Sequence, residues 1–104
     1  LFDDPEEVLK RLGDNTAVVC YNDEVAFGLV KCLLSAGRRV PEDVAVVSFD
    51  NSNLSWISQV PITSLSYEDR NIGRIAAQKL VDILDGRDVS SEVLPWTFIQ
   101  KESS

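Results

Sequence analysis

The stretch GRRVPEDVAVVSFDNS, residues 37–52, decides the fold because it joins a polar turn, a buried strand and a polar loop. Its apolar run at 44–49 is short, rich in valine and free of strict alternation. Such a run is typical of a strand covered on both faces, as in a parallel sheet. The run TAVVCY at 16–21 has the same character, and residues 22–36 predict a helix stopped by Gly37. Strand, helix and strand predict a βαβ unit with parallel strands.

The flanking segments extend this pattern. Residues 5–12 predict a helix that begins with a proline and two glutamates and ends at Gly13. Beyond the central loop, residues 61–66 predict a short strand, 68–85 a long amphipathic helix and 93–100 a last strand. The predicted fold class is therefore α/β, with a Rossmann-like parallel sheet flanked by helices.

Composition limits the function classes. The chain has 104 residues, 44% of them hydrophobic, which suffices for one domain or one lobe of a larger domain. The net charge of −7, from 10 basic and 17 acidic residues, argues against direct contact with nucleic-acid phosphates. No apolar run approaches the ~18 residues of a membrane span. Because the chain starts at Leu1 and contains no methionine, we interpret it as a fragment.

The chain offers little for catalysis or metal binding. It has no histidine, and Cys20 and Cys32 lack the C-x-x-C spacing of a zinc site, so we interpret them as reduced thiols of an intracellular, cytoplasmic protein. There is no G-x-S-x-G elbow and no phosphate-binding glycine loop. The sequence therefore predicts no enzyme, no catalytic residue, no metal and no cofactor.

The helix predicted after the first strand is apolar nearly all round. From residue 24 to 36 only Glu24, Lys31 and Ser35 are clearly polar. A helix of this kind must be covered on both sides. One side can face the sheet, and the other is covered either by a second subunit or by the rest of the chain.

Polar residues follow the two central strands. In parallel sheets ligands bind outside the carboxyl ends of the strands, where Asn22 and Asp50 fall. The Asp50 carboxylate can accept hydrogen bonds from two adjacent hydroxyls of a ligand, or it can cap a neighbouring turn. The amide of Asn22 can bind hydroxyls, or it can cap the following helix, a role that we expect Asp23 to take.

Three segments carry a family resemblance. The residues CYNDEVAFG at 20–28 resemble a strand-to-helix signature, and 37–52 is similar to the stretch G-x-x-V-P-x-D-x-x-V-x-G-[FY]-D-[DN]-[ST]. The third segment is PITSL at 61–65 with the helix that follows it. Together they resemble bacterial transcription regulators of the LacI/GalR family. Ser48 and Asn51 depart from the pattern, which usually has glycine and commonly has aspartate at these places.

The resemblance implies a fold of the periplasmic-binding-protein type, with two α/β lobes and a sugar cleft between them. Residues 1–104 would be the C-terminal part of this effector-binding domain, and the helix at 68–85 would pack on the N-terminal lobe. The same resemblance implies that the effector is a sugar and that the whole protein is a homodimer. It also implies that DNA is bound by a separate N-terminal domain. An arabinose-responsive repressor is the subtype that it favours.

The resemblance also assigns ligand contacts. Asn22 and Asp50 match sugar-contact positions, and Tyr67, at the crossover between the lobes, resembles a third; an aromatic ring can cover a sugar face or simply pack under the hinge. Trp56 can line the cleft or shield the edge of the lobe, of which we expect the second, and we expect Trp96 to lie in the core.

Two other function classes remain open at this point. One is a periplasmic sugar-binding protein of a transporter, which has the same fold but no DNA-binding head. The other is a small α/β enzyme of flavodoxin-like topology.

Overall fold

The computed structural model describes residues 2–67 and 71–104. Contacts between Cα atoms divide the chain into two compact units, Leu1–Ser66 with Phe98–Ser104, and Tyr67–Thr97. Each unit is described below by itself. No helix among the described residues has the length and apolar character needed to cross a membrane.

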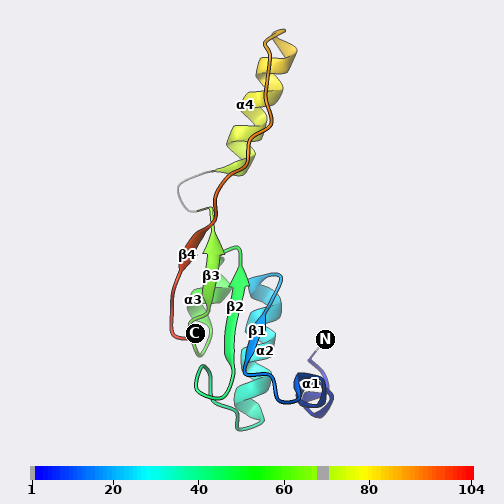
Figure 1. The fold of residues 1–104 in the computed structure, drawn as a ribbon, viewed down its shortest axis with the longest axis vertical. Coiled ribbons are helices and arrows are strands. Elements are labelled where there is room, and N and C mark those ends of the chain that lie inside the picture. Colours follow the sequence, from blue (N-terminus) through cyan, green and yellow to red (C-terminus); the bar gives the residue numbers. More distant parts are fainter. Residues whose placement is uncertain (1, 68–70) are drawn as a thin grey trace. The chain divides into compact units, whose positions relative to one another are not determined.

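The first unit is built on a four-stranded sheet in the order β1-β2-β3-β4, formed by Ala17–Val19, Ala45–Phe49, Thr63–Ser66 and Thr97–Ile99 (Figure 1). β1 pairs with β2, and β2 with β3, in parallel. The predicted βαβ unit and the α/β fold class are confirmed. The last strand is shorter than the predicted span of 93–100 and runs against β3, so the sheet is mixed at this edge.

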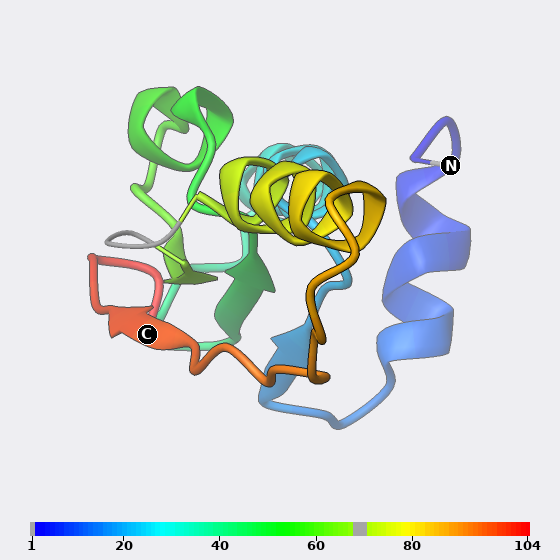
Figure 2. The same ribbon diagram turned by 90° about the horizontal axis from the view of Figure 1, so that it is seen from above.

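Three helices belong to the first unit. α1 spans Pro5–Leu12, α2 spans Asp23–Ser35 and α3 spans Asn53–Ile57. α2 and α3 lie on the same face of the sheet, as Figures 1 and 2 agree. The sequence pattern predicts the first two helices, but it predicts a loop where α3 begins. Five residues are too few for an apolar stripe to be recognised.

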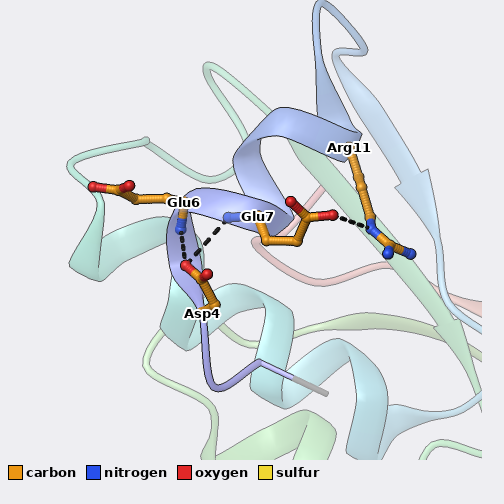
Figure 3. Close-up of polar contacts among 4 residues, drawn as sticks. All are labelled: Asp4, Glu6, Glu7 and Arg11. Carbon is orange, nitrogen blue, oxygen red and sulfur yellow. Dashed lines mark hydrogen bonds and ion pairs between the residues drawn. The ribbon is translucent and has the colours of Figure 1, made fainter.

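The start of α1 follows from local chemistry, which Figure 3 shows. The Asp4 carboxylate accepts hydrogen bonds from the backbone N–H of Glu6 at 3.0 Å and of Glu7 at 3.3 Å. One turn later Arg11 donates to Glu7 at 2.9 Å. The helix ends at Gly13, whose φ of 56° favours glycine.

The core of the first unit lies between α2 and the sheet. It contains nine buried residues, namely Cys20, Ala26, Leu29, Val30, Leu33, Val40, Val44, Val46 and Ile62. α2 contacts β2, α3 and α1, and the partly buried side chains of Phe27 and Leu34 pack against the same core. The chain itself therefore covers much of the apolar surface of α2.

The second unit consists of α4, Ile72–Leu84, and the segment that returns along it. Asn71 caps the helix by accepting from the backbone N–H of Arg74 at 2.9 Å, and Lys79 donates to the carbonyl of Ser90 at 2.8 Å. The predicted start at residue 68 lies outside the described residues. No described residue of α4 is buried, and Leu80 is 57% exposed.

The C-terminal tail closes the amino ends of the strands. Ser103 is fully buried, and its hydroxyl donates to the carbonyl of Val46 and accepts from the backbone N–H of Thr63 at 2.8 Å. Its own carbonyl accepts from the backbone N–H of Val46 at 2.8 Å. The tail thereby occupies hydrogen-bonding groups of two strands at once.

Replacement of Ser103 by alanine should therefore destabilise the fold. Ser103→Ala leaves two buried backbone groups without their partner, which costs about 1–3 kcal/mol. Urea denaturation of the full-length protein measures this loss. The control Ser91→Ala, at an exposed position, should stay within about 0.5 kcal/mol of wild type. Equal stability of the two variants would contradict the role assigned to Ser103.

Candidate functional site

Asn22 lies just beyond the carboxyl end of β1. Its backbone is extended, and its side-chain oxygen accepts from the backbone N–H of Val25 at 3.0 Å, so Asn22 is the N-cap of α2. The prediction that Asp23 is the cap is wrong, because Asp23 is already the first residue of the helix. The cap uses only the oxygen of the Asn22 amide, and its two N–H donors are not part of this bond.

Asp23 instead points into the protein and is 1% exposed. Its Oδ1 accepts hydrogen bonds from the hydroxyls of Ser48 and, at 2.8 Å, Ser64. Its Oδ2 accepts from the backbone N–H of Ser52 at 2.5 Å. A buried carboxylate is tolerated only when it is hydrogen-bonded in this way. The cluster of Asp23, Ser48 and Ser64 could not be predicted from the sequence. No local pattern indicates that residues on α2, β2 and β3 meet.

Asp50 lies at the carboxyl end of β2 and is exposed. Its φ is 100° and that of Asn51 is 50°, so two successive non-glycine residues have positive φ. Aspartate and asparagine tolerate this region better than most residues, but it is still uncommon and clusters at ligand-binding sites. Hydrogen bonds hold the loop, including one from the Asp50 N–H to the carbonyl of Leu65 at 2.9 Å.

Lys101 supports the same loop from the C-terminal segment. Its Nζ donates to Asn51 Oδ1 at 2.8 Å, to Ser55 Oγ at 2.9 Å and to the carbonyl of Ile62 at 2.9 Å. It also lies 4.2 Å from the ring centroid of Trp56. Trp56, 54% exposed, thus has one ring face covered by a cation at the edge of the unit.

Tyr67 belongs to the second unit, whereas Asn22 and Asp50 belong to the first. The ring of Tyr67 packs against that of Trp96, with centroids 3.9 Å apart and planes at 35°. The prediction that Trp96 lies in the core is wrong. β4 begins only at Thr97, so Trp96 lies in the returning segment and is 42% exposed.

A groove of about 960 Å³ lies elsewhere, along β1 between α1 and α2. Its walls include the apolar side chains of Val8, Val18 and Leu29, and none of the predicted ligand contacts lines it. The groove and the polar loop are therefore separate features.

The cysteines and acidic residues form no metal centre among the residues that the structure describes. Cys20 and Cys32 are free thiols, and both are buried. Burial raises the pKa of Cys20 to about 11, and burial together with the charge of Asp4 raises that of Cys32. Both effects disfavour the reactive thiolate.

The geometry thus defines an α/β domain with polar, backbone-anchored groups at the carboxyl ends of parallel strands. A family model described as a periplasmic binding protein-like domain matches residues 3–104. The chain belongs to this family.

Curated relatives agree with the assignment. The chain is 39% identical over 80 residues to the transcriptional regulator CelR of Thermobifida fusca, covering 77% of this chain and 24% of the relative. It is 35% identical over 78 residues to the repressor PurR of Vibrio atlanticus, with 75% and 23% covered. The arabinose metabolism transcriptional repressor of Geobacillus stearothermophilus is 34% identical over 74 residues, with 71% and 20% covered. The chain spans about a quarter of the length of these relatives.

Solved structures are similar over almost the whole chain. A CelR–cellobiose complex has a TM-score of 0.86 at 33% identity, covering 99% of this chain and 32% of that chain. A LacI-family regulator from Arthrobacter sp. FB24 in complex with lactose has a TM-score of 0.83 at 28% identity, with 99% and 40% covered. The resemblance to regulators of the LacI/GalR type is thereby confirmed.

The raised pKa of Cys20 predicts slow alkylation. Relative to a thiol at the ordinary pKa of 9.0, a pKa of about 11 leaves about a hundredfold less thiolate at about pH 8. Iodoacetamide labelling followed by peptide mass spectrometry should find Cys20 nearly unmodified in the native protein and fully modified in denaturing urea. Rapid native labelling would contradict the burial of this thiol.

Proposed function

We propose that the chain is the C-terminal part of the effector-binding domain of a LacI-type transcriptional regulator, and that its effector is a sugar. The observation that carries the proposal is the loop of Asp50. It presents an exposed carboxylate at a strand end, on a backbone of unusual conformation that hydrogen bonds hold in place. Loops of this kind at the carboxyl ends of parallel strands are the usual ligand sites of α/β sheets.

Three residues would contact the effector. Asp50 accepts from two adjacent hydroxyls, Asn22 donates through its amide N–H groups, and Tyr67 offers a ring face and a hydroxyl. Similar proteins support a sugar, since two of the solved structures are complexes with cellobiose and with lactose, and one relative is an arabinose metabolism repressor. Among regulators of this type, the sequence favours an arabinose-responsive repressor.

Regulation would operate through parts outside these 104 residues. DNA would be bound by a separate N-terminal domain, which agrees with the acidic character of this chain. The sugar would alter DNA binding by favouring one of two arrangements of the protein. The transporter alternative is less favoured, because these relatives are transcriptional regulators. We propose a cytoplasmic protein with neither catalytic activity nor a cofactor.

Exposed apolar residues indicate surfaces that would contact other parts of the regulator, namely the N-terminal lobe and a second subunit. α4 carries Ile72, Leu80 and Ile83 at 47%, 57% and 57% exposure, and we propose that this helix packs on the N-terminal lobe. α3 packs on α2 and carries Ile57 at 69% exposure, which supports a homodimer through this side of the first unit.

Replacement of Asp50 tests the site. Asp50→Asn keeps a residue that tolerates positive φ but removes the charge, so sugar affinity should fall at least about tenfold, or about 1.4 kcal/mol. Calorimetric titration of the full-length protein with L-arabinose, D-galactose, D-glucose, lactose and cellobiose measures it. Asp14→Asn, at another exposed aspartate, is the matched control. Unchanged affinity in Asp50→Asn would contradict the site.

Asn22 allows capping and ligand contact to be separated. Asn22→Ser retains a capping oxygen for Val25 but removes the amide donors, so stability should stay near wild type while affinity falls. Asn22→Ala should lose affinity and, in addition, about 1 kcal/mol of stability. Thermal unfolding and the same titrations distinguish the two effects. Wild-type affinity in Asn22→Ser would mean that Asn22 is only a helix cap.

A further inference from the structure

The first residue of α2 and two facing residues of β2 and β3 form a buried polar set, defined here as Asp23, Ser48 and Ser64. These side chains are 1%, 0% and 0% exposed. Ser48 and Ser64 are direct register partners on the two parallel strands, and both hydroxyls donate to the same oxygen of Asp23. The buried polar set therefore joins the start of α2 to two adjacent strands.

The same set holds the backbone that follows Asp50. The Asn51 N–H donates to Ser64 Oγ at 3.0 Å, and the Ser52 N–H donates to Asp23 Oδ2 at 2.5 Å. Both peptide groups directly after Asp50 thus end on the buried polar set. Two further bonds restrain the loop, one from the Asp50 N–H to the carbonyl of Leu65 and one from Lys101 Nζ to Asn51 Oδ1.

These restraints coincide with the unusual backbone of the loop. Asp50 and Asn51 have φ values of 100° and 50°, a conformation that such residues keep only when their surroundings impose it. The two N–H bonds to Ser64 and Asp23 restrain this backbone, together with the bonds of Asp50 to Leu65 and of Asn51 to Lys101. Without them the loop has access to ordinary negative φ values, which would turn the Asp50 side chain in another direction.

Core packing alone does not account for the set. Apolar residues at all three positions 23, 48 and 64 would fill the same space with no carboxylate to satisfy, and buried polar groups are costly unless they are hydrogen-bonded. Here the carboxylate and one hydroxyl each accept a loop N–H in addition to their bonds with one another. Two members of the buried polar set, Ser64 and Asp23, thus bind the backbone of the loop.

We propose that Asp23, Ser48 and Ser64 are positioning residues for Asp50: they do not touch the effector, but hold the Asp50 carboxylate in its binding orientation before the effector arrives. This inference rests on the proposed function of Asp50. A group fixed in advance loses less conformational freedom on binding, so the set raises affinity rather than adding a contact.

The serine variants provide the test, because Asp23→Asn has a greater chance of failing to fold. Ser48→Ala and Ser64→Ala each delete one hydroxyl. Ser103→Ala is the matched control, since it also removes a fully buried, doubly bonded serine hydroxyl, but one whose partners are strand backbone groups of Val46 and Thr63 and not the Asp50 loop. Full-length variants are titrated with the five sugars named above, at a temperature where circular dichroism shows all of them folded.

We expect Ser64→Ala to weaken sugar binding about tenfold and Ser48→Ala several-fold, while Ser103→Ala binds like wild type despite its lower stability. Hydrogen exchange gives a second readout without any sugar. The Asn51 and Ser52 amides should exchange faster in Ser64→Ala and remain unchanged in Ser103→Ala.

These measurements distinguish failure of the positioning role from failure of the proposed function. If Asp50→Asn loses binding but both serine variants bind within about twofold of wild type, the positioning role is wrong and the proposed function stands. If Ser103→Ala weakens binding as much as Ser64→Ala, the effect is general destabilisation and the positioning role is again wrong. If no sugar binds, or Asp50→Asn binds normally, both proposals fall together.

Discussion

A carboxylate withdrawn from water must be hydrogen-bonded, and the way Asp23 meets this requirement organises one end of the molecule. Its two oxygens accept from Ser48 on β2, Ser64 on β3 and the backbone after β2. Each of these bonds fixes a different segment relative to the start of α2. The register of the parallel strands, the entry of the helix and the course of the Asp50 loop are therefore mutually dependent. Removing one partner would leave the buried carboxylate with fewer hydrogen bonds and would weaken the hold on the remaining segments, so the arrangement is cooperative.

The two ends of the sheet serve different purposes. At the amino ends, Ser103 and the C-terminal tail satisfy strand groups and remain buried, which contributes stability alone. At the carboxyl ends, similar hydroxyls satisfy a loop whose exposed residue is the proposed effector contact. Apolar residues of α2 and the strands fill the space between, so each end is supported by the same core. This division explains why a serine at one end and a serine at the other, equally buried, have different expected effects on binding.

The sequence predicted the architecture well because the architecture follows from local patterns. Two apolar runs, a helix between them and a stop at Gly37 suffice for the βαβ unit, and they correctly place Asn22 and Asp50 at strand ends. The misjudged residues depend on tertiary contacts instead. Asn22 and Asp23 are equally good caps in isolation, and only the partners of Asp23 across the sheet decide between them. Trp96 was misjudged because the last strand is shorter than its pattern indicates.

The departures from the family pattern now have physical roles in this chain. Ser48, where glycine is usual, donates to Asp23, and Asn51, where aspartate is common, accepts from Lys101. Asn51 is itself part of the loop that carries Asp50, whereas Ser48 acts one step away, through the Asp23 carboxylate that accepts from the Ser52 N–H. Bonds to Leu65, to Ser64 and Asp23, and to Lys101 all lie within the first unit, so the Asp50 loop is held without any contribution from a ligand. An effector that contacts Asp50 would therefore meet a loop that is already ordered, and the conformational freedom that this loop loses on binding would be small.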